Sequence, residues 1–62
     1  MNLSNFKSMD PNILYSMVNM ALRDFGENLS AFCKTHDINE EELKEVLAKA
    51  DYHYIEEINQ FK

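Results

Sequence analysis

The 62-residue sequence contains one cysteine, one proline, one glycine and no tryptophan. A single cysteine excludes an intramolecular disulfide, and with no signal peptide visible we expect a cytoplasmic protein. Since glycine and proline are scarce, many short strands joined by turns are disfavoured and a few helices are favoured. A chain of this length forms one domain at most and buries only about 60 % of its unfolded surface.

Positive charge and long apolar runs are also scarce. Six Lys and Arg residues stand against eleven Asp and Glu residues, which gives a net charge of −5. Phosphate backbones and anionic membrane surfaces are bound mainly through Lys and Arg, so nucleic-acid and membrane partners are both disfavoured. The longest apolar region, residues 13–22, is interrupted by Ser16 and Asn19. It also falls short of the ~20 residues that span a bilayer.

What the sequence does contain is a helical pattern. Apolar residues make up 45 % of the chain, and their spacing by three and four predicts a first helix over residues 11–25. Asp10 can cap this helix, Pro11 suits its first position, and Gly26 can end it. The side chains expected to face the core are Leu14, Met17, Val18, Ala21, Leu22 and Phe25.

Two shorter helices are predicted after the first. Asn28 can cap a helix over residues 29–35, and Asn39 can cap a third over residues 40–50. Glu42 is placed to reach back to the Asn39 amide in a capping box. The buried stripe of the third helix is predicted at Leu43, Val46, Leu47 and Ala50.

The two ends of the chain differ in pattern. Residues 1–9 are predicted to form a flexible N-terminal arm, and residues 10–62 a single helical domain. In the closing segment we expect Tyr52–Tyr54 to be extended and a short helical turn to follow. A sheet is not expected, because one strand alone has no partner. The predicted fold is all-α: a small three-helix bundle with helix-turn-helix-like packing of its second and third helices, and an aromatic C-terminal flap.

Residues 32–47 have the spacing of a helix-turn-helix. Phe32 is followed by the small Cys33, Asp37 is placed at the turn, and Ile38 is the apolar plug after it. A recognition helix reads bases with its N-terminal part, which here carries Glu40, Glu41, Lys44 and Glu45. Since three of these four are carboxylates that would face phosphates, nucleic-acid binding is kept only as the alternative function.

Few side chains point to catalysis or to metal binding. Cys33 and His36 stand three apart on one predicted helix, but a zinc site needs about four ligands and His53 is the only further histidine. A buried small thiol is therefore the expected role of Cys33. The acidic pairs lie on open helix faces, and no glycine-rich phosphate loop is present. We expect no catalytic residues, no metal, no cofactor and no enzymatic activity.

One group of side chains is a candidate interaction surface. The group is apolar, lies beside the first helix, and consists of Phe6, Met9, Ile13 and Met20. Methionine-rich surfaces adapt to their partners. Because self-association would cover such a surface in so small a chain, the expected partner is another protein or a second copy. The expected function is thus a non-enzymatic protein-interaction module.

A second group is a candidate structural anchor. Asn19 and Arg23 stand one helical turn apart, opposite the predicted core stripe. We expect Arg23 to bind the C-terminal segment, through a carboxylate of Glu56 or Glu57 or through the amide of Asn59. An ordinary polar helix face, or a site for a bound partner, are the alternatives for these residues.

Three separated segments resemble one family of short bacterial proteins. The segments are DPNILYSMVNMALRD at residues 10–24, NLSAFCKTHDIN at 28–39 and YHYIEEINQF at 52–61. Their pattern is similar to the domain of unknown function family 4250. This chain departs from the pattern at Phe32, where a Leu is usual, and at Asp51, where a Gly precedes the aromatic pair. The resemblance implies a small bacterial protein without an established activity, and it implies no catalytic or binding residues.

Overall fold

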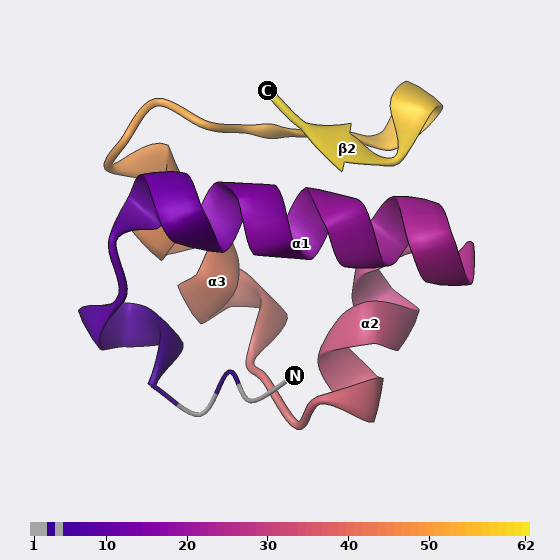
Figure 1. Ribbon diagram of the computed structural model, residues 1–62, viewed down its shortest axis with the longest axis horizontal. Helices are drawn as coiled ribbons and strands as arrows, with labels where there is room; N and C mark the ends of the chain where they lie inside the picture. The colour runs from indigo at the N-terminus through magenta and orange to yellow at the C-terminus, as the bar shows by residue number, and fades with distance from the viewer. Residues whose placement is uncertain (1–2, 4) are drawn as a thin grey trace.

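The computed structural model describes Leu3 and residues 5–62, which form a mostly helical fold with a small β-hairpin (Figure 1). The elements are the 3-10 helix η1 (Phe6–Ser8), α1 (Pro11–Phe25), α2 (Leu29–Thr35), α3 (Glu40–Ala48), β1 (Tyr54–Ile55), the 3-10 helix η2 (Glu56–Ile58) and β2 (Gln60–Phe61). In Figure 1, α1 crosses the middle, the hairpin lies along its upper side, and α2 and α3 lie below. Over the described part of the chain, no helix has the length and apolarity that crossing a membrane requires.

All three α-helices begin where the capping pattern predicts. The side-chain oxygens of Asp10, Asn28 and Asn39 accept hydrogen bonds from amides two or three residues later, at 2.8, 2.8 and 3.1 Å. These bonds satisfy amides that the helix itself leaves unpaired. The predicted capping box at Asn39 does not form, because the Glu42 carboxylate lies 2.7 Å from the Lys7 ammonium instead.

The helices end in left-handed residues that are mostly not glycine. Gly26 ends α1 with φ of 68°, as predicted. Asp37 and Asp51 follow α2 and α3 with φ of 56° and 68°. In each case the aspartate amide and the next amide bond back to helix carbonyls three and five residues earlier, which is the Schellman arrangement. The turn at Asp51 also ends α3 at Ala48, two residues before the predicted end.

The core forms where α1, α2, α3 and β2 meet. Its members are Leu3, Phe6, Leu14, Val18, Ala21, Leu22, Leu29, Phe32, Cys33, Ile38, Leu43, Leu47 and Phe61. Two predictions about the stripe of α1 need correction. Phe25 is 67 % exposed because it lies at the last position of the helix, and Met17 is only partly buried.

The prediction of a loose N-terminal arm is corrected for the part that the structure describes. Leu3 is only 3 % exposed and Phe6 only 7 %, and both belong to the core. The η1 turn packs against α3, and Lys7 forms its ion pair with Glu42 there. Two apolar side chains were therefore enough to dock this segment. Residues 1, 2 and 4 of the predicted arm lie outside the described residues.

The C-terminal segment is extended and then helical, as predicted, but it also forms the sheet that was not expected. β1 and β2 pair antiparallel, with Tyr54 opposite Phe61 and Ile55 opposite Gln60. Beyond them, His53 and Lys62 exchange two backbone hydrogen bonds of 2.8 and 2.9 Å. The chain reverses at Asn59, whose φ of 52° turns it back after η2. The missing strand partner is thus the end of the same segment.

Candidate functional site

The Asn19 side chain binds both backbone groups of Phe61. Its Nδ2 donates to the Phe61 carbonyl at 3.0 Å, and its Oδ1 accepts from the Phe61 amide at 2.7 Å. A neighbouring strand would offer the same donor and acceptor pair. Next to it, the Gln60 amide donates to the Asn19 carbonyl at 3.2 Å. Asn19 therefore acts as a one-residue strand that attaches β2 to α1.

Asn59 holds the other end of the hairpin. Its Nδ2 donates to the Glu27 carbonyl at 2.8 Å, and its Oδ1 accepts from the Tyr54 hydroxyl at 2.5 Å. A third attachment is aromatic, since the Tyr52 ring stacks on Tyr15 with ring centres 3.9 Å apart. Gln60 and the tyrosines were not singled out from the sequence as anchors, although all of them lie in segments that carry the family resemblance.

Arg23 takes no part in this attachment, which corrects the prediction made for it. The guanidinium Nε lies 3.5 Å from its neighbour Asp24, and both side chains are mostly exposed. The hairpin does reach this end of α1, since Asn59 binds the Glu27 carbonyl beyond the helix. Arg23 is left out because its side chain points into solvent.

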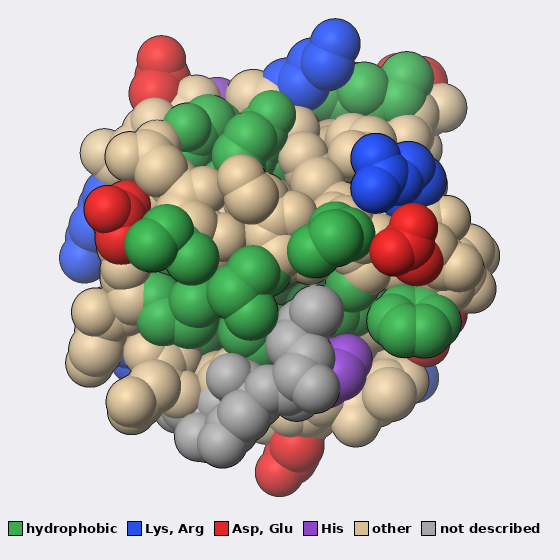
Figure 2. Space-filling view, in the orientation of Figure 1, with side chains coloured by type: hydrophobic (Ala, Val, Ile, Leu, Met, Phe, Trp, Pro, Cys, Tyr) green, Lys and Arg blue, Asp and Glu red, His purple; other side chains and the backbone are tan. Residues whose placement is uncertain are grey.

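The predicted apolar surface is smaller than expected. Phe6 lies in the core and Met9 is partly buried, whereas Ile13 is 55 % exposed and Met20 45 %. Figure 2 shows hydrophobic side chains gathered along the face of α1 that is turned to the viewer. We define the α1 surface as Ile13, Met20 and the partly buried Met17 between them.

The structure places Cys33 inside the helical core and not in an accessible reactive site. Burial raises the pKa of the Cys33 thiol from 9.0 to about 11, and the nearby Glu40 carboxylate acts in the same direction. A thiol of this kind is almost entirely protonated at neutral pH, and only the thiolate is strongly nucleophilic or metal-binding. His36 packs its ring against Phe32, with ring centres 4.6 Å apart. Among the described residues, no group of three or more potential metal-ligating side chains is found.

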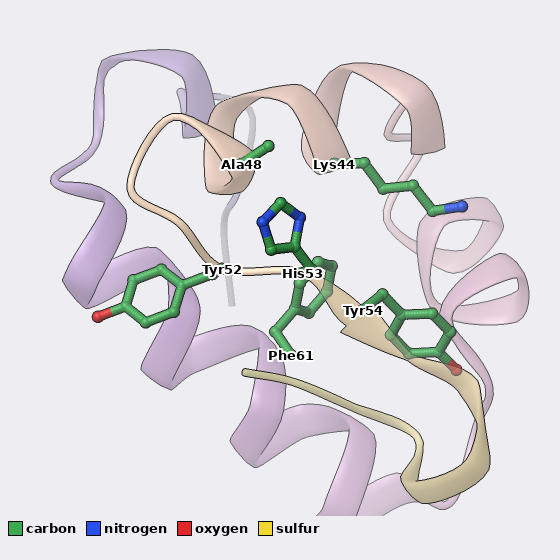
Figure 3. Close-up of a pocket in the computed structure, with 6 residues that line it drawn as sticks. All are labelled: Lys44, Ala48, Tyr52, His53, Tyr54 and Phe61. Atoms are coloured by element: carbon green, nitrogen blue, oxygen red, sulfur yellow. The ribbon is translucent and has the colours of Figure 1, made fainter.

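Two open pockets lie beside α3 and the hairpin, and the second extends to the start of α2. The first has a volume of about 260 Å³ and is lined by Lys44, Ala48, Tyr52, His53, Tyr54 and Phe61 (Figure 3). The second has a volume of about 220 Å³ and is lined by Asn28, Leu29, Ser30, Glu40, Lys44, Tyr54 and Glu56. Lys44 and Tyr54 line both, so the pockets adjoin. Since neither is enclosed in the core, the arrangement suits binding at a surface better than chemistry in a closed site.

Comparisons with known proteins identify one family. The model of the domain of unknown function DUF4250 matches residues 8–61, which is nearly the whole chain. No curated protein and no solved structure matches this sequence.

Proposed function

The chain belongs to the DUF4250 family, and we propose that it is a small, non-enzymatic protein-interaction module of the bacterial cytoplasm. Its contact surface in this proposal is the α1 surface, and its partner is a second copy of the chain. The observation that supports it most directly is the exposure of Ile13 and Met20 on the side of α1 that faces away from the core.

The spacing of the two side chains supports a symmetric contact. Ile13 and Met20 stand seven residues apart, so they project from the same side of α1 about 10 Å from each other. A two-fold axis between them brings Ile13 of one copy opposite Met20 of the other. Self-complementary pairing of this kind is the usual arrangement in homodimers. The partly buried Met17 lies at the centre and can adapt its conformation to the contact.

Charge sets the conditions under which this contact forms. Each copy carries a net charge of −5, so two copies repel each other at low ionic strength. Salt screens this repulsion and strengthens apolar contact at the same time. The proposed dimer should therefore become more stable as the salt concentration rises.

Analytical ultracentrifugation over a range of concentrations up to about 1 mM tests the proposal, because a contact of this size is expected to be weak. We expect the average mass of the wild type to rise above 7.3 kDa, and to rise further in high salt. The double variant Ile13→Ser, Met20→Ser should remain monomeric. The matched control is Ile58→Ser, which removes an exposed apolar side chain away from α1 and should behave as the wild type. A wild type that stays monomeric throughout would overturn the proposal.

Nucleic-acid binding through α2 and α3 is the second candidate, and the tight turn at Asp37 supports helix-turn-helix-like packing of these two helices. The charge of α3 argues against it. Lys44, the cation among the four expected contact residues, already lies 3.3 Å from Glu40. We expect no mobility shift with duplex DNA even at low salt, where phosphate contacts are strongest. A salt-sensitive shift that is lost in Lys44→Glu would favour this function over the first.

A further inference from the structure

The two outer edges of the hairpin differ in how their backbone groups are satisfied. In an antiparallel pair, residues alternate between those that bond across the ladder and those whose amide and carbonyl point away from it. His53 and Lys62 form a bonded pair, so the next pair, Tyr54 and Phe61, directs its backbone groups outward on both sides.

On the β2 side these outward groups are satisfied, because Asn19 binds both of them on Phe61. On the β1 side they are not. The Tyr54 amide and carbonyl form none of the turn, cap or side-chain hydrogen bonds found among the described residues, and the ladder directs both groups away from β2. One edge of the sheet is thus closed by a side chain, and the other presents a donor and an acceptor at the spacing that an added strand requires.

The open edge faces the groove between the hairpin and α3. The first pocket lies in this groove, the second continues from it to the start of α2, and Tyr54 lines each of them. In Figure 3, the Lys44 side chain extends from α3 along the groove above Tyr54, and the His53 ring stands beside it. Adjacent pockets along a strand edge can accept side chains of an extended segment that point to the same side, about 7 Å apart.

We propose that this groove binds an extended segment of a partner protein, which pairs with Tyr54 as a third strand beside β1. Strand addition to an open sheet edge is a general mode of peptide recognition, in which backbone bonds give affinity and pockets give selectivity. The residues of this groove are not part of the α1 surface, so the inference does not depend on the function proposed above.

The charges of the groove define the segment further. The first pocket is lined by Lys44 and His53 and by no carboxylate, whereas Glu40 and Glu56 line the second. Lys44 lies 3.3 Å from Glu40 and His53 lies 3.4 Å from Asp51, but neither carboxylate lines the first pocket. The Lys44 ammonium, which has three hydrogen-bond donors, is therefore the main cation that faces this pocket. The segment therefore carries an acidic side chain or a terminal carboxylate at the first pocket and a neutral side chain at the second.

Hydrogen exchange in the free protein gives the first test. The Tyr54 amide should exchange at least about tenfold faster than the Ile55 amide, because Ile55 lies in a pair that bonds across the ladder. Equal protection of the two amides would show that the edge is not open, and it would overturn the proposal before any partner is sought.

Selection of random octapeptides displayed on phage gives the second test, with the immobilised wild-type protein as the target. We expect the enriched peptides to contain an acidic residue, and to shift the backbone resonances of Tyr54, Lys44 and Ser30 in labelled protein. No enrichment over the bare support would overturn the proposal. So would enriched peptides that shift the α1 surface instead.

Variants then separate this site from general electrostatic attraction. Lys44→Glu should weaken binding of the enriched peptides at least tenfold, whereas Lys49→Glu, the same charge change just beyond the end of α3, should have little effect. Methylating the peptide nitrogen that pairs with the Tyr54 carbonyl should also weaken binding about tenfold. The variant Ile13→Ser, Met20→Ser should bind the peptides as the wild type does. Equal losses in both lysine variants would contradict the proposed site.

Discussion

The helical part of the molecule and its C-terminal hairpin are held together in different ways. Each α-helix carries its own capping residue and buries a continuous stripe of leucine, valine or phenylalanine side chains. The hairpin has two strands of two residues each, and it inserts a single side chain, Phe61, fully into the core. Most of its remaining attachment comes from the amide side chains of Asn19, Asn59 and Gln60.

The helices are therefore specified by residues in their own segments, whereas the hairpin depends on residues of α1 that are distant in the sequence. A capped amphipathic helix is specified by its own residues. A two-stranded hairpin is marginal by itself in water, so it depends on the α1 groups that receive it. Four predictions test how far the two parts depend on each other.

Phe61→Ala should have the largest effect. Removing a fully buried phenylalanine costs about 3–5 kcal/mol of unfolding free energy, which approaches the whole stability of a domain of this size. Far-UV circular dichroism during urea unfolding should show loss of the helices together with the hairpin. The matched variant is Phe32→Ala, which removes a buried phenylalanine of α2 from the same core. It should lower the unfolding free energy by a similar amount. If Phe61→Ala frees only the hairpin and leaves the helices stable, the two parts are separable.

The second prediction concerns Cys33, which reports on the helical part. Because a thiol is neutral when protonated, a raised pKa means that the folded protein holds this proton more tightly than the unfolded chain does. The resulting stability is complete below pH 9 and is lost as the pH rises from 9.0 towards about 11. Thermal unfolding should show this loss in the wild type and a smaller one in Cys33→Ala, where only the other groups titrate.

The same shift predicts slow labelling of Cys33. At pH 8 the thiolate fraction is about a hundredfold lower than in an unshifted cysteine, and burial slows the reaction further. Labelling by a thiol reagent at the rate of a free thiol would contradict both statements. It would also show that the helical part opens more readily than its packing indicates.

Asn19→Ala should have an intermediate effect. It leaves the amide and carbonyl of Phe61 without partners in a partly buried place, which costs about 1–3 kcal/mol. Ser16→Ala, an exposed change on the same helix, should stay within about 0.5 kcal/mol of the wild type. Hydrogen exchange should show the greatest loss of protection in the hairpin amides. Unchanged exchange there would mean that Phe61 and the stacked tyrosines hold the hairpin without Asn19.

Asp51→Gly should have the smallest effect and the opposite sign. Asp51 occupies the left-handed position after α3, where glycine avoids the steric cost that other residues carry. We expect a gain of about 0.5 kcal/mol in unfolding free energy. Asp37→Gly is the corresponding change after α2, and a similar gain would show that both turns obey the same rule. A loss at Asp51 alone would assign a role to its contact with His53.

The helices were predictable from the sequence and the hairpin was only half predictable. The bounds of α1 and α2 agree with the predictions, because their capping residues and apolar spacing act within a few residues. Ile55, Ile58 and Phe61 have helical spacing, and this spacing concealed the second strand. The strand pairs with β1, and Asn19, 42 residues before Phe61, binds its backbone. Such a contact leaves no local pattern.

For the candidate sites too, the sequence indicated individual residues better than the contacts that these residues form. Asn19 and Asn59 were singled out by their positions. Asn19 binds the hairpin from α1, and Asn59 lies within the hairpin and binds the Glu27 carbonyl. Arg23 lies one turn after Asn19, but its side chain is mostly exposed and lies beside Asp24. Phe6 was expected at the surface because its segment was expected to be loose, and it lies in the core instead. The open edge at Tyr54 had no counterpart in the prediction, since it exists only once the two strands pair.

The one-sided closure of the hairpin has a consequence for assembly of the chain into larger structures. A small sheet with two open edges can join further copies on either side, and this process continues without limit as a fibre. When Asn19 occupies the β2 edge, the sheet itself can be extended by another copy only through β1. A single asparagine therefore limits growth of the sheet by edge pairing, and replacing it opens a second edge as well as removing a contact.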